Sequence, residues 1–73
     1  MLLVHVDQSG LVDDLVEYLR GRSCIVERGD GDAVLASIPK SLSAEGSRLE
    51  LDLYLRAWEA SRPGARATRV GER

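Results

Sequence analysis

The stretch VHVDQSGLVDDLVEYLRGRSCIV, residues 4–26, decides the fold because it passes from the pattern of a strand to that of a helix and back. Just before and within it, residues 2–6 are short, rich in β-formers and apolar on both faces. Alternation places three side chains on one side and two on the other: Leu2, Val4 and Val6, against Leu3 and His5. We therefore predict a central strand over residues 2–6.

The segment DQSG, residues 7–10, ends this alternation, and a helical pattern begins at Leu11. Apolar residues then recur on one face of a helix, opposite acidic and basic residues: Leu11, Val12, Leu15, Val16, Tyr18 and Leu19, opposite Asp13, Glu17 and Arg20. Ser9 is the expected N-cap and Gly21 suits the C-terminal end. The pattern predicts one amphipathic helix.

Residues 23–28 and 32–38 have the composition of strands, and GDGD at 29–32 joins them. Gly and Asp tolerate the positive φ that tight hairpins require, so the two strands are expected to be antiparallel neighbours. Pro39 ends the second of them.

Residues 40–62 form the second predicted helix, but its start is ambiguous. Ser41 is one possible cap. Ser47 is the other possible cap, because Ser47 and Glu50 have the spacing of a capping box. In that case a short turn precedes a helix that begins at about Ser47. The Pro-Gly pair at 63–64 ends the helix.

A fourth strand is expected over residues 65–70, before a frayed GER tail. The order β-α-β-β-α-β, with right-handed crossovers, predicts an α+β fold: a ferredoxin-like two-layer sandwich, with a four-stranded antiparallel sheet and both helices on one face. Residues 1–73 make a single domain.

The second predicted helix has two apolar stripes on roughly opposite sides. One stripe consists of Leu42, Leu49, Leu53, Ala57 and Ala60, and the other of Leu51, Tyr54, Leu55 and Trp58. We expect one stripe to pack on the sheet. We assign the Trp58 stripe to a partner, and homodimerisation is the favoured form. The alternative is that the first helix and the tail cover it.

The composition argues against several partners. The chain has 73 residues, a net charge of −2, and Tyr18, Tyr54 and Trp58 as its only aromatics, so nucleic acid is not an expected partner. No segment has the length of a membrane span and no signal peptide is evident, so we expect a cytoplasmic protein that does not contact membranes. A domain of this size often needs a partner for stability.

No catalytic or metal-binding set is evident. Cys24 and His5 are the only cysteine and the only histidine and lie on different strands, which disfavours nucleophilic catalysis and zinc or copper binding. We expect Cys24 to be buried and structural. Asp13 and Asp14 diverge by 100° on a helix and do not face one site. The chain is not expected to be an enzyme or to hold a cofactor or metal.

The loop after the first strand is a chemically sensible ligand site, because a carboxylate, a glycine and a helix N-terminus follow one another there. Residues 4–26 resemble the first half of an ACT domain, an amino-acid-sensing module of many metabolic enzymes. The shared pattern is a strand, Asp or Asn, two residues, Gly-Leu, a helix and a second strand. The closing PGARATRV, residues 63–70, is similar to the last turn and strand of that family.

The resemblance implies a small-molecule effector bound where two domains abut, and it assigns site residues. His5 matches the polar residue of the strand, Asp7 the residue that opens the loop and Gly10 the glycine. Asp7 would accept from an ammonium group, the N–H groups of Ser9, Gly10 and Leu11 would bind a carboxylate, and His5 would complete the pocket. Cys24 stands where the family has Asn, and Ser9 replaces the common proline.

Two functions are therefore kept open. The first is a stand-alone interaction or regulatory module that homodimerises and binds a small polar metabolite near residues 7–10. The second is a protein-binding adaptor that uses the stripe Leu51, Tyr54, Leu55 and Trp58, with no ligand at the loop.

Overall fold

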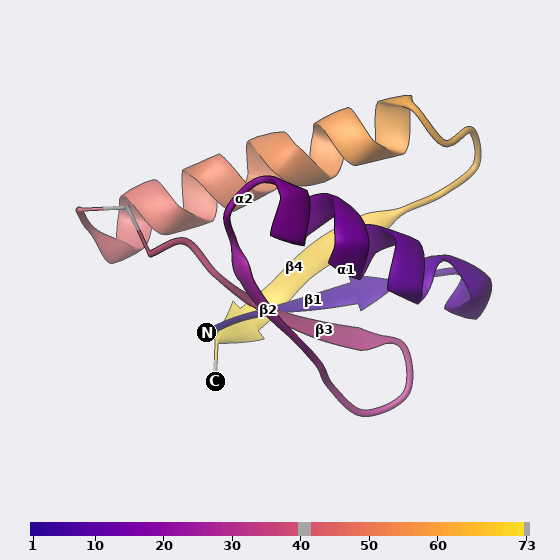
Figure 1. Cartoon of the computed structure of the whole chain (residues 1–73), viewed down its shortest axis with the longest axis horizontal. Helices are drawn as coiled ribbons and strands as arrows, with labels where there is room; N and C mark the ends of the chain where they lie inside the picture. Colours follow the sequence, from indigo (N-terminus) through magenta and orange to yellow (C-terminus); the bar gives the residue numbers. More distant parts are fainter. Residues whose placement is uncertain (40–41, 73) are drawn as a thin grey trace.

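The computed structural model describes residues 1–39 and 42–72 and has the predicted order of elements (Figure 1). Along the chain these are β1 (Leu2–Val6), α1 (Val12–Gly21), β2 (Ile25–Arg28), β3 (Ala33–Ser37), α2 (Ala44–Ala60) and β4 (Ala67–Glu72). A 3₁₀ turn, Ser9–Leu11, lies between β1 and α1.

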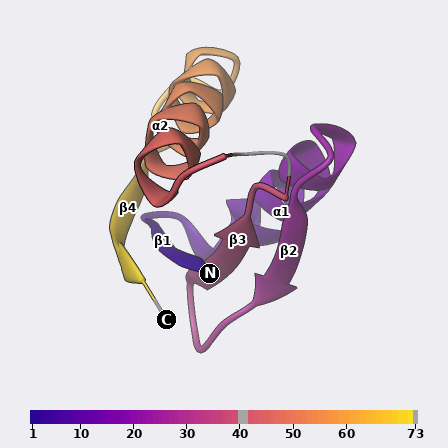
Figure 2. The ribbon, with the colours of Figure 1, turned by 90° about the vertical axis from the view of Figure 1, so that its left-hand side faces the viewer.

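The four strands form one antiparallel sheet in the order β2-β3-β1-β4. Figure 2 shows α1 and α2 side by side on the same face of this sheet. The predicted ferredoxin-like sandwich is thereby confirmed. The strand β1 is central, as its apolar faces indicated, and lies between β3 and β4.

The core fills the space between the sheet and the helices. Leu2, Val4 and Val6 of β1 point into it, as predicted from their alternation. The helix α1 contributes four buried side chains, Val12, Leu15, Val16 and Leu19. The helix α2 contributes three, Leu51, Leu55 and Trp58. Each large side chain that is removed from water stabilises the fold by about 1.5–3 kcal/mol.

The two stripes of α2 face the opposite way from the prediction: the stripe expected to meet a partner is buried, and the stripe expected on the sheet is exposed. Leu51, Leu55 and Trp58 are 0%, 3% and 0% exposed, with Tyr54 half-buried, whereas Leu49 and Leu53 are 62% and 68% exposed. The stripe assigned to a partner is therefore buried between the sheet and α1, so that assignment is wrong. The alternative, cover by the first helix and the tail, named α1 but not the sheet. Burying a tryptophan and two leucines removes more apolar surface from water than burying leucines and alanines.

The hairpin between β2 and β3 is the predicted tight turn. Gly29 N–H donates to Ala33 O at 2.9 Å, and Ala33 N–H donates to Asp30 O at 3.1 Å. Gly31 has a φ of 59°, a value that glycine adopts without strain.

Three predicted helix and strand ends are wrong. The N-cap of α2 is Ser43, whose hydroxyl accepts from Gly46 N–H at 2.9 Å, and Ser47 lies inside the helix; the proposed cap Ser41 and its neighbour Lys40 fall outside the described residues. Ser9 does not cap α1, because it is the first residue of the 3₁₀ turn and Leu11 occupies the N-cap position of α1. Residues 71–72 of the predicted tail extend β4, and Arg73 is not described.

Candidate interaction surfaces

The loop after β1 is tied to the connection between α2 and β4. Asp7 N–H donates to Arg66 O at 3.0 Å, and Asp7 Oδ1 accepts from Arg66 N–H at 2.9 Å. The Gln8 side chain donates to Gly64 O at 3.0 Å. These bonds continue the pairing of β1 and β4 beyond the strand ends. Asp7 therefore stabilises the connection between α2 and β4 without a ligand.

The other residues of the predicted ligand site are spread over this end of the molecule. His5 is exposed on the side of the sheet that the helices leave open, where it pairs with Ala33 and Thr68. Ser9 and Gly10 are exposed, Leu11 is half-buried, and Leu11 N–H donates to Gln8 O. Three cavities of the described structure are lined by other residues.

Cys24 is buried, as predicted, and lies directly before β2. Burial raises the pKa of its thiol, and the charge of Glu50 raises it further. A thiol with a raised pKa is a poor nucleophile, which fits a packing role.

Asp13 and Asp14 turn to different partners, as their spacing on a helix required. Asp13 forms an ion pair with Arg28 of β2. Asp14 accepts from Trp58 Nε1 at 2.8 Å and forms an ion pair with Arg62. The hydrogen bond from Arg62, followed by that from Trp58, lowers the pKa of Asp14. Asp14 therefore joins the two helices and satisfies the indole of a buried tryptophan.

The open face of the sheet carries apolar side chains from all four strands. Leu3 and Leu35 pair across β1 and β3 and are half-buried. Ile25 of β2 and Val70 of β4 are 54% and 57% exposed. Val70 lies at the bulge where the β1–β4 register shifts. The side chains of α1 and α2 pack on the opposite face, so within the described residues this apolar face is uncovered.

A second apolar surface lies along the outer side of α2. Leu49, Leu53, Ala57 and Ala60 follow one another at helical spacing, and all are exposed. We call this set the outer stripe. Its last two members are small.

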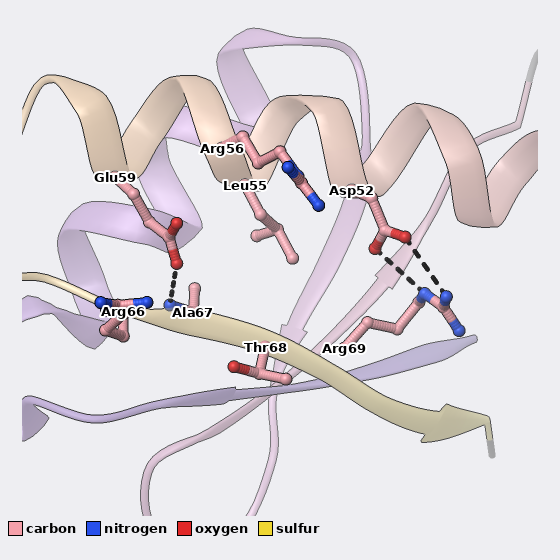
Figure 3. Close-up of a pocket in the computed structure, with 8 residues that line it drawn as sticks. All are labelled: Asp52, Leu55, Arg56, Glu59, Arg66, Ala67, Thr68 and Arg69. Atoms are coloured by element: carbon pink, nitrogen blue, oxygen red, sulfur yellow. Dashed lines mark hydrogen bonds and ion pairs between the residues drawn. The ribbon is translucent and has the colours of Figure 1, made fainter.

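A cavity of about 410 Å³ lies between α2 and β4 (Figure 3). Arg69 donates to both Asp52 oxygens at 3.1 and 3.2 Å, and Glu59 Oε2 accepts from Ala67 N–H at 2.8 Å. Figure 3 shows these two contacts on either side of Leu55 and Arg56. We call this cavity the α2–β4 bay.

The chain matches no known family model, no curated protein and no solved structure. Within residues 1–39 and 42–72, no three His, Cys, Asp or Glu side chains are grouped so as to hold a metal ion. In the same residues, neither helix has the length and apolar character needed to cross a membrane.

The apolar residues on both faces of β1 already indicated in the sequence that the second face of the sheet is a candidate interaction surface. We assigned that role to a stripe of α2 instead. A strand with apolar residues on both faces, such as β1, needs cover on both sides. When both helices lie on one face, the side chains of Leu3 and its neighbours on the other face are left open. The bay gave no such signal, because its residues come from two elements that meet only in the folded chain.

Proposed function

We propose that this protein is a non-catalytic interaction module that self-associates through the open face of its sheet. The observation that carries the proposal is the uncovered apolar set Leu3, Ile25, Leu35 and Val70, one residue from each strand. Uncovered apolar side chains on every strand of one sheet face are typical of an association site.

A second copy of the chain suits this face because its central pair of leucines, Leu3 and Leu35, can cover the same pair of the other copy. Glu27 lies beside Leu35 on β2, and His5 lies two residues from Leu3 on β1. Glu27 therefore lies in the same cross-strand row as the Leu3–Leu35 pair, and His5 lies in the next row, beside Ala33. A two-fold axis parallel to the strands, in the plane between two stacked sheets, can place Leu3 of one copy over Leu35 of the other.

The size of the face supports a reversible association. Four strands about 4.8 Å apart and five residues of about 3.4 Å each cover roughly 300 Å² in projection. Stable interfaces bury about 800 Å² on each partner. We therefore expect a dimer that dissociates on dilution. The resemblance of residues 4–26 to ACT domains supports the same proposal, since those domains bind their ligand where two of them abut.

The competing function is a protein-binding adaptor that uses α2. The four residues first assigned to it are not available, because Leu51, Leu55 and Trp58 are buried and Tyr54 is half-buried. The outer stripe is the surface that α2 does expose, with Leu49 and Leu53 at its centre.

Sedimentation velocity on matched variants separates the two surfaces. The wild-type protein should gain mass between about 10 μM and about 1 mM, the range of weak complexes. Ile25→Asp should keep it monomeric, because the carboxylate would be buried at the interface. Leu53→Asp is the matched control at a similarly exposed position and should associate like the wild type. A monomeric wild type, or a loss of association in Leu53→Asp alone, would contradict the proposal.

A further inference from the structure

The α2–β4 bay has a contact between α2 and β4 at each end and one charged group, the guanidinium of Arg56, between them. The Asp52–Arg69 pair lies at one end, and the Glu59 contact with Ala67 lies at the other. Between them the side chain of Arg56 extends from α2 into the space above β4 (Figure 3). Leu55 forms part of the wall.

Two arginines that line the bay differ from the other described arginines in the surroundings of their guanidinium groups. Six have a charged, carbonyl or aromatic partner: Arg20 with Val26 O, Arg22 with Tyr18, Arg28 with Asp13, Arg48 with Glu72, Arg62 with Asp14, and Arg69 with Asp52. Within residues 1–39 and 42–72, the guanidinium groups of Arg56 and Arg66 have no such partner. Both line the same cavity, one from α2 and one from the residue before β4.

The charge of the bay is opposite to that of the chain. Three guanidinium groups and two carboxylates line it, and both carboxylates already accept hydrogen bonds from β4. The chain as a whole has a net charge of −2. Unpaired guanidinium groups in a locally positive cavity attract anions, and their donors match carboxylate and phosphate oxygens.

We propose that the α2–β4 bay binds a small oxyanion ligand, a molecule that carries a carboxylate or a phosphate group. Arg56 contacts the anion inside the bay, and Arg66 contacts it from the residue before β4. The volume of about 410 Å³ lies within the range of small-molecule sites, about 300–1,000 Å³. The site is distinct from the open face of the sheet, and it adjoins the loop after β1 through the backbone of Arg66, which bonds to Asp7.

Titration of the ¹⁵N-labelled full chain tests this site. The probes are inorganic phosphate and succinate, each compared with sodium chloride at matched ionic strength. At least one probe should cause saturable shifts of the backbone amides of Arg56, Arg66 and Thr68. A response to phosphate alone or to succinate alone would support the proposal and identify which oxyanion the ligand carries.

Matched variants show whether the bay itself is responsible. Arg56→Gln should weaken binding by about tenfold or more, the effect of removing a charge-assisted hydrogen bond. Arg28→Gln removes another exposed arginine on β2 and should leave binding unchanged. Circular dichroism should show both variants folded. The proposal is overturned if neither probe gives saturable shifts, if Arg56→Gln binds like the wild type, or if Arg28→Gln weakens binding equally.

Discussion

Asp14 is the residue on which the contact between the two helices depends. Its carboxylate accepts from the indole of Trp58 at 2.8 Å and from Arg62 at 3.2 Å, so the buried tryptophan has no unsatisfied donor. The Arg62 guanidinium also lies over the Trp58 ring, at 5.4 Å from its centroid. Charge, hydrogen bonding and packing are thus combined where α1 meets the end of α2.

We predict that Asp14→Asn lowers the free energy of unfolding by about 1 kcal/mol, because the ion pair with Arg62 is lost. The effect is no larger because Asp14 is partly exposed to solvent, which screens the ion pair. Urea unfolding at neutral pH measures this. Asp13→Asn is the matched control, since the Asp13 side chain is 86% exposed, and it should change stability by less than about 0.5 kcal/mol. Equal effects of the two substitutions would contradict the role assigned to Asp14.

The same residue makes stability depend on pH. The pKa of Asp14 in the folded protein lies below the ordinary value of 3.8, so the unfolded chain binds the proton more tightly. The stabilisation is therefore present above about pH 4 and is lost as the pH falls through the lower, folded-state pKa. Urea midpoints at a series of pH values should show this loss in the wild type, and Asp14→Asn should lack that part of it.

At the scale of elements, α2 has two apolar sides but only one that packs on the sheet. We predict that Leu51→Ala lowers the free energy of unfolding by about 2–5 kcal/mol, because it leaves a cavity in the core. Leu53→Ala, two residues away on the exposed side, should change it by less than about 0.5 kcal/mol. Urea unfolding of the two variants checks which stripe faces the sheet, and a larger loss in Leu53→Ala would show that the helix is rotated.

The elements whose signals are local were predictable from the sequence. The alternation of β1, the helical spacing of α1 and the glycines of the hairpin each depend on residues close together in the chain. The cap of α2 was ambiguous because serines stand at positions 41, 43 and 47. The choice between the stripes of α2 depends on how α1 packs, and that is not a property of α2 alone.

At the scale of the whole molecule, contacts between distant residues decide what the candidate sites can do. Asp7, expected to contact a ligand, bonds to a residue 59 positions away in the sequence. The bay likewise combines residues of α2 and β4. Its composition offered no motif, because Arg56 and Arg66 are unusual only in lacking the partners that the other described arginines have.

The layered fold determines which surface is open for the proposed self-association. Both helices cover one face of the sheet, so the other face keeps its apolar residues in contact with water (Figure 2). Two copies can cover that face for each other without rearrangement of either core. Self-association and the oxyanion site then occupy different surfaces and can be lost separately.

The most direct test of self-association through the sheet is a dilution series of ¹H–¹⁵N spectra of the wild-type protein. Between about 1 mM and about 10 μM, the range of weak complexes, the amides of Leu3, Ile25, Leu35 and Val70 should shift while those of Leu49 and Leu53 stay constant. Spectra that do not change with concentration, or shifts confined to the outer stripe of α2, would contradict the account.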